Sequence, residues 1–222
     1  MPPREIRGPA GRLEALLEEP VAPGTVGHDG RVSLGHPSGL RAAVVFAHPL
    51  TSQGGTMHTK VVYQSAKALS RIGCAVLRFN FRGAGASEGT FSNGPGEQDD
   101  FRAALDDMAA EYPGPLWVAG MSFGAWVAMS VGAEDPRVSA LIGIAPPVTR
   151  YDFGAVERSP KPKFLVQGEF DEICFLKDTR AFYARAAEPK ELVVIDAADH
   201  LFDGKVAEVA DALEDLLGDF HE

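Results

Sequence analysis

The chain of 222 residues has the length of one globular domain and is long enough to bury a sizeable core. Its 31 acidic residues outnumber its 21 basic residues, so the formal net charge is -10 at pH 7. This balance argues against a nucleic-acid surface and against attraction to anionic lipid, and we expect neither a nucleic-acid nor a membrane partner.

The first residues contain no apolar run typical of a secretory signal, and no apolar run elsewhere is long enough to span a bilayer. The two cysteines, Cys74 and Cys174, lack C-x-x-C spacing, and we expect free thiols of a reducing compartment. The sequence therefore predicts a cytoplasmic protein.

The first 40 residues are expected to form a hairpin and a loop in front of the catalytic core. Residues 4–20 fit a hairpin, although the leucines of its second half, residues 12–19, also fit a short amphipathic helix. Residues 21–40 are rich in Gly, Pro, His and Ser, which is typical of a loop, with a short strand predicted at residues 31–34.

From residue 41 onward, apolar strands alternate with amphipathic helices. The expected strands are 42–47, 75–79, 116–119, 138–144, 163–166 and 192–195, and the expected helices are 57–71, 97–111, one that starts at Phe123, 177–187 and 205–220. This alternation predicts an α/β fold with a doubly wound, mostly parallel sheet and helices on both faces. We expect a single domain over residues 1–222, with the catalytic core at 41–222 and its ligand at the carboxyl ends of the strands.

The central motif is the G-x-S-x-G of residues 120–124, which stands between an apolar strand and a helix. In such a turn the serine occupies a strained backbone position and projects its hydroxyl from the top of the sheet. Ser122 is therefore the candidate nucleophile, and the backbone N–H of Phe123, at the helix N-terminus, can point at a developing oxyanion. The alternative is a glycine-rich loop with a surface serine, so the interpretation depends on a histidine and an acid downstream.

Both partners follow later strands. His200 lies in the loop after the last expected strand, where it can serve as the general base for a serine, although it could also be a surface loop histidine. Asp171 follows the strand at 163–166 and is the candidate acid that holds the imidazole tautomer. The competing acids are Glu169, which is the first substitute, Glu172 and Asp178. The order Ser122, Asp171, His200 is that of α/β-hydrolases.

Taken together, these motifs resemble the α/β-hydrolase superfamily, and more narrowly the small bacterial hydrolases without a lid that are related to dienelactone hydrolase. The stretches that carry the resemblance are His48-Pro49-Leu50, Gly54-Gly55-Thr56-Met57, residues 78–89, the serine turn and Ala198-Asp199-His200. The resemblance implies a second oxyanion donor, which by position is the backbone N–H of Leu50, because Pro49 has none. It implies loop-shaping roles for His48 and for residues 82–89. Dienelactone hydrolases proper use a cysteine nucleophile, so their own reaction is not expected of Ser122.

We expect no cofactor and no metal. No glycine follows Gly85 at the spacing of a dinucleotide fingerprint. The histidines are His28, His36, His48, His58, His200 and His221, and none of them forms H-E-x-x-H or another paired metal-binding spacing.

Residues 145–162, between two expected strands, are too few for a cap domain, so we expect a site open to water. The candidate pocket residues are Val148, Phe153, Phe175, Leu201 and Phe202, an apolar set that suits a small acyl group. His58 could contact the substrate or simply start a helix, and Arg150 is a candidate to bind a substrate carboxylate.

The sequence therefore predicts a carboxylesterase-like serine hydrolase that cleaves small carboxylic esters through an acyl-enzyme intermediate. A thioesterase or a small-peptide hydrolase could use the same residues. The alternative outside enzymes is a catalytically silent α/β-hydrolase fold that binds a ligand. We expect a small-molecule substrate and a monomer or homodimer.

Overall fold

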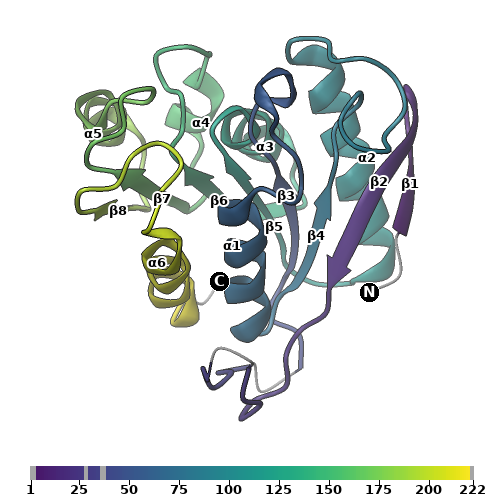
Figure 1. The fold of residues 1–222 in the computed structure, drawn as a ribbon, viewed down its shortest axis with the longest axis horizontal. Coiled ribbons are helices and arrows are strands. Elements are labelled where there is room, and N and C mark those ends of the chain that lie inside the picture. The colour runs from purple at the N-terminus through teal and green to yellow at the C-terminus, as the bar shows by residue number, and fades with distance from the viewer. Residues whose placement is uncertain (1–3, 28–29, 36–38, 221–222) are drawn as a thin grey trace.

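The computed structural model describes residues 4–27, 30–35 and 39–220 (Figure 1). Within this part of the chain, one eight-stranded sheet has the order β1-β2-β4-β3-β5-β6-β7-β8. Strands β1 (Arg4–Gly8) and β2 (Gly11–Glu18) form an antiparallel hairpin, and β2 also pairs antiparallel with β4 (Ala75–Phe79). The other neighbours pair in parallel, which confirms the predicted α/β fold.

The remaining elements alternate along the chain as the sequence predicts. The other strands are β3 (Ala43–Ala47), β5 (Leu116–Met121), β6 (Val138–Ile144), β7 (Lys163–Gly168) and β8 (Lys190–Ile195). The helices are η1 (Thr51–Gln53), α1 (Lys60–Arg71), α2 (Pro95–Glu111), α3 (Phe123–Glu134), α4 (Gly154–Arg158), α5 (Leu176–Arg185) and α6 (Val206–Gly218).

The sheet carries helices on both faces, with α1 and α6 in front of it in Figure 1 and α2 and α3 behind it. Strand β3 shows how the sequence produces this division, because side chains alternate between the two faces of a strand. Val44 and Phe46 pack with the buried residues of α1 and α6, whereas Val45 packs with those of α2 and α3. A strand buried on both faces has no polar side, and all five residues of β3 are buried.

Several local predictions need correction. The predicted N-terminal hairpin is confirmed, and only the alternative, a helix over residues 12–19, is wrong, because this segment is strand β2. The predicted helix at 57–71 begins later, at Lys60, because the Met57 N–H donates to Asn80 Oδ1 at 2.8 Å and keeps this segment in a loop. The predicted strand at 31–34 is reduced to one isolated bridge between Val32 and Val26. Residues 28–29 and 36–38 of the expected loop lie outside the described residues.

The segment between β6 and β7 contains the short helix α4, which the sequence analysis did not predict, and no cap domain. Cys74 and Cys174 are both buried and free, as predicted. Among the helices of the described residues, none is both long and apolar enough to cross a membrane.

A buried ion pair fastens the hairpin to the loop in front of α1. Arg78 of β4 contacts Glu18 of β2 at 2.7 Å and donates to the carbonyl of Met57 at 2.6 Å. Both charged side chains are almost fully buried. Lys67 of α1 contacts the other oxygen of Glu18 at 2.6 Å, but its side chain is 38% exposed.

Replacing Glu18 should therefore be costly. In Glu18→Ala the buried Arg78 loses its compensating charge, and we expect the free energy of unfolding to fall by about 3 to 5 kcal/mol. Lys67→Ala, which removes the exposed partner of the same carboxylate, should cost about 1 kcal/mol or less. Urea denaturation measures both values. Equal losses in the two variants would show that the Arg78 pair does not stabilise the hairpin.

Candidate active site

Ser122 lies between β5 and α3 in a strained turn. Its φ of 53° and ψ of -123° are unusual for a residue with a side chain, and its N–H is held by the carbonyl of Ile144 at 2.8 Å. A Cβ atom at Gly120 would lie 2.2 Å from the carbonyl oxygen of Gly124, and one at Gly124 would lie 2.4 Å from that of His48. The two flanking glycines are thus required by the close approach of the backbone around the serine.

Three side chains from separate strand ends form one hydrogen-bonded chain. His200, after β8, has its Nε2 atom 3.0 Å from Ser122 Oγ. Its Nδ1 atom lies 2.8 Å from Oδ2 of Asp171, which follows β7. An ionised carboxylate can only accept, so Nδ1 carries the proton and Nε2 is free to accept from the serine hydroxyl. This arrangement is suited to removal of the Ser122 proton.

The carboxylate of Asp171 is buried and accepts several hydrogen bonds from protein groups. Its Oδ1 accepts the N–H groups of Ile173 at 2.8 Å and Cys174 at 2.7 Å. Burial opposes ionisation, but the hydrogen bond from His200 and these backbone donors keep the pKa of Asp171 below its usual range. Asp171 therefore stays negative at neutral pH. Among the competing acids, Glu169 instead accepts the N–H of Ala197 at 2.9 Å.

Gln167, at the end of β7, was not singled out from the sequence. Its Nε2 donates to Asp171 Oδ2 at 3.0 Å and to the carbonyl of Cys174 at 2.8 Å, and its Oε1 accepts from Thr179 at 2.9 Å. Gln167 is fully buried. It therefore holds the carboxylate through Oδ2, whereas the backbone donors hold it through Oδ1. The one signal in the sequence is a polar residue that ends an apolar strand shortly before the acid.

The two backbone groups expected as oxyanion donors both border the cavity that contains Ser122. The N–H of Phe123 is at the first position of α3, where a helix provides no internal acceptor. The N–H of Leu50 donates to no carbonyl among the described residues. Both groups are thus available to an oxygen atom of a ligand.

His48 shapes the loop that carries Leu50. Its Nδ1 donates to the carbonyl of Pro49 at 2.6 Å, and its Nε2 accepts the N–H of Phe81 at 3.0 Å. The ring is fully buried, and this burial lowers the pKa of His48 to about 4. His48 is therefore neutral at physiological pH and holds the end of β3 against the segment after β4.

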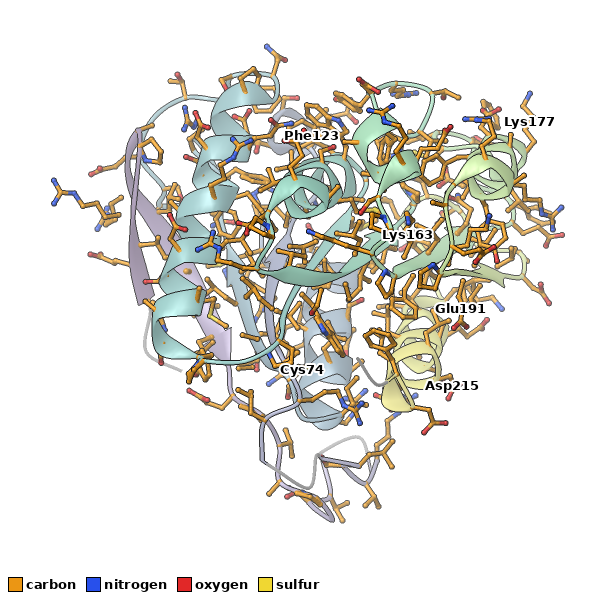
Figure 2. All side chains as sticks on the ribbon, turned by 180° about the vertical axis from the view of Figure 1, so that it is seen from behind. Cys74, Phe123, Lys163, Lys177, Glu191 and Asp215 are labelled. Atoms are coloured by element: carbon orange, nitrogen blue, oxygen red, sulfur yellow. The ribbon has the colours of Figure 1, made fainter. Side chains whose placement is uncertain are left out.

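An aromatic cluster surrounds the start of α3, where Figure 2 labels Phe123. The Phe123 ring makes edge contacts with Phe81 and Tyr151, at centroid distances of 5.9 and 5.7 Å. Tyr151 in turn stacks on Trp126 at 4.4 Å, and Trp126 Nε1 donates to the carbonyl of Asp152 at 3.0 Å. These contacts fix the turn after β6 against α3.

The cavity in front of Ser122 and His200 has a volume of about 550 Å³. Of the predicted pocket residues, Leu201 lines it, and so do both expected oxyanion residues and Arg150. The lining also includes residues that the sequence analysis did not single out for the pocket, among them Gln53, Thr59, Tyr151 and Ile173.

The other four predicted pocket residues do not border the cavity and need correction. Phe202 is fully buried in the core beneath α6, and Phe153 is buried against Phe182 at 5.6 Å. Val148 packs on the core of the opposite face. Phe175 is exposed away from the cavity, with Lys177 over its ring. His58 is also exposed and outside the lining.

One group of side chains among the described residues could hold a metal ion. Ligand atoms of Asp171, Cys174 and His200 all lie within 4.8 Å of one another. However, Asp171 and His200 already bind each other, and burial raises the pKa of Cys174 to about 12, which keeps the thiol protonated. A bound ion would compete with the hydrogen bond between His200 and Asp171. His28, His36 and His221 lie outside the described residues.

The parallel sheet, the strained serine and the histidine after the last strand are the marks of an α/β serine hydrolase. The chain belongs to the family described as serine aminopeptidase, S33, whose family model matches residues 39–158. This membership identifies the chain as an enzyme of the hydrolase class.

Several known proteins are similar to this chain over nearly its whole length. The uncharacterized protein RP471 of Rickettsia prowazekii is 35% identical over 98% of this chain and 89% of its own length. The structure of an alpha-beta serine hydrolase homologue from Coxiella burnetii has a TM-score of 0.85 at 33% identity and covers 97% of both chains.

XC6422 of Xanthomonas campestris, described as an α/β serine hydrolase without lid, has a TM-score of 0.84 at 33% identity, over 96% of this chain and 92% of its own. The predicted superfamily and the absence of a cap domain are thereby confirmed. The narrower relation to dienelactone hydrolase is not tested by these matches and stays a prediction.

The role of His48 can be tested through pH. Its pKa of about 4 lies below the ordinary value of 6.5. Between pH 6.5 and pH 4, His48 therefore binds a proton in the unfolded chain but not in the folded chain. Stability should therefore fall as the pH drops through this window. Relative to His48→Gln, the wild type should lose about 3 kcal/mol more unfolding free energy between about pH 7 and pH 4.

Urea denaturation of both proteins at the two pH values measures this difference. Every other titrating group is present in both proteins and cancels in the comparison. Identical pH dependence in the two proteins would mean that His48 is not held neutral by its burial.

Proposed function

We propose that this chain is a serine hydrolase that cleaves small carboxylic esters through an acyl intermediate on Ser122. The observation that carries the proposal is the continuous hydrogen-bond chain from Asp171 through His200 to the serine hydroxyl, at the edge of an accessible cavity. His200 is the proposed general base, and Asp171 is the proposed carboxylate that orients it.

In the proposed reaction, His200 Nε2 accepts the hydroxyl proton while Ser122 Oγ attacks the ester carbonyl carbon. The carbonyl oxygen becomes an oxyanion, which the N–H groups of Leu50 and Phe123 stabilise. One such hydrogen bond typically lowers the barrier by about 3 kcal/mol. The tetrahedral intermediate then collapses, the ester C–O bond breaks, and the protonated His200 gives its proton to the leaving alcohol.

The second half of the reaction uses the same groups with water in place of serine. His200 Nε2 removes a proton from a water molecule, whose oxygen attacks the acyl carbon. The bond to Ser122 Oγ breaks, and the proton returns from His200 to the serine. Asp171 remains ionised throughout and stabilises the imidazolium, because the pKa of its carboxyl group lies below the usual range.

The charge of the cavity favours an ester over an N-terminal peptide. An aminopeptidase must bind the positive α-ammonium group of its substrate, which calls for an acidic side chain at the site. Among the described residues, no Asp or Glu lines the cavity, and Arg150 does. The match to a family described as serine aminopeptidase therefore supports the hydrolase class better than it supports peptide cleavage by this chain. A thioesterase would use the same groups, and an acyl-CoA substrate separates it from an esterase.

Replacing the nucleophile or the base should abolish ester hydrolysis. We expect Ser122→Ala and His200→Ala each to lower kcat for para-nitrophenyl acetate by at least about a thousandfold, because the proton transfer and the covalent step depend on both. His58→Ala removes an exposed histidine outside the cavity and serves as the matched control, with wild-type kcat.

Hydrolysis at the wild-type rate by either catalytic variant would reject the assignment. The wild type should also be assayed with an acyl-CoA and a peptide anilide. A much higher kcat/KM for one of these would replace the ester with a thioester or a peptide as the substrate of the same site.

A further inference from the structure

Arg150 lies on the cavity wall but has no part in the proposed ester hydrolysis. It follows β6, on the same cavity as Ser122 and His200, and its side chain is exposed. In the described parts of the chain, no carboxylate forms an ion pair with it. A guanidinium has five N–H donors in a planar fork and always carries its charge, so this one is available to a ligand.

The backbone at Arg150 is held in place on both sides. The N–H of Arg150 donates to the carbonyl of Pro147 at 3.0 Å, which closes a tight turn. The next residue, Tyr151, stacks on Trp126, and Trp126 is bonded to the carbonyl of Asp152. The side chain therefore leaves a fixed point on the cavity wall, which lowers the entropy lost when it binds a ligand.

The electrostatics of the cavity favour a negative ligand group. Although the chain as a whole is acidic, no Asp or Glu within the described residues borders the cavity. The charge of Arg150 also reaches the side chains around the candidate triad. Burial and the nearby Asp171 raise the pKa of Cys174, and the positive charge of Arg150 acts against this rise. The Sγ atom of Cys174 lies within 4.8 Å of a carboxylate oxygen of Asp171 and of a ring nitrogen of His200.

We propose that Arg150 determines specificity by binding a carboxylate of the substrate, so that the preferred substrates are esters that carry a free carboxylate beside the scissile bond. This inference rests on the proposed ester hydrolysis and names its substrate class. The apolar side chains of Ile173 and Leu201 line the same cavity and suit the hydrocarbon part of such a molecule.

Two matched pairs of esters test the proposal. Monoethyl glutarate has a carboxylate on the acyl side where ethyl valerate has a methyl group. Para-acetoxybenzoate has a carboxylate on the alcohol side where para-tolyl acetate has a methyl group. In Arg150→Gln, the ratio of kcat/KM for the anionic ester to that for the neutral ester should fall about tenfold in at least one pair. The pair affected identifies the side of the ester that faces Arg150.

Two further variants separate a specific contact from general charge. Arg150→Lys keeps the charge but loses the planar fork, so it should restore part of the ratio. Arg180→Gln removes the charge of an exposed arginine on α5 that lies outside the cavity, and it should leave the ratio at the wild-type value. An unchanged ratio in Arg150→Gln for both pairs, or an equal fall in Arg180→Gln, would overturn the proposal.

A binding measurement distinguishes failure of this inference from failure of the proposed function. If the wild type hydrolyses none of the four esters, the ester hydrolysis is wrong, but the role of Arg150 can still be decided without turnover. Calorimetric titration of Ser122→Ala with monoethyl glutarate and with para-acetoxybenzoate should give, for at least one of the two ligands, a Kd about tenfold lower than titration of Ser122→Ala/Arg150→Gln. Equal Kd values in the two proteins for both ligands would refute carboxylate binding by Arg150.

Discussion

The hydrogen bond from His200 Nδ1 to Asp171 Oδ2, at 2.8 Å, decides which nitrogen of the imidazole faces Ser122. With Nδ1 protonated, Nε2 presents a lone pair to the serine hydroxyl at 3.0 Å. The carboxylate can impose this tautomer because Gln167 and the backbone of the segment after β7 hold it in place. The proposed chemistry depends on this contact, since a histidine with the opposite tautomer could not accept the proton.

The sheet supplies the second constraint, because it brings distant residues to a common edge. Ser122, Asp171 and His200 follow β5, β7 and β8, whose parallel pairing places their carboxyl ends together. The close backbone approach at Gly120 and Gly124 allows α3 to begin directly under the serine. The N–H of the first helical residue, Phe123, has no acceptor inside the helix, and Phe123 and Leu50 both border the cavity.

The sequence was sufficient to predict the order of strands and helices and the three polar residues at the strand ends, because periodicity and the G-x-S-x-G spacing are local signals. The pocket was harder to predict. Phe202 and Leu201 are adjacent and both apolar, yet one is fully buried and the other is 55% exposed on the cavity wall. Composition does not distinguish these positions. The role of Gln167 and the start of α1 were not predicted for a related reason. Both depend on side-chain hydrogen bonds that hydrophobic periodicity does not reveal.

The most direct test of the proposed nucleophile is its reaction with a fluorophosphonate probe, followed by mass-spectrometric mapping of the modified residue. The hydrogen-bond chain predicts rapid labelling of Ser122 in the folded wild type and much slower labelling in His200→Ala, where the base is missing. Absence of labelling in the folded wild type, or modification of a different serine, would contradict the proposed mechanism and favour a fold that binds its ligand without chemistry.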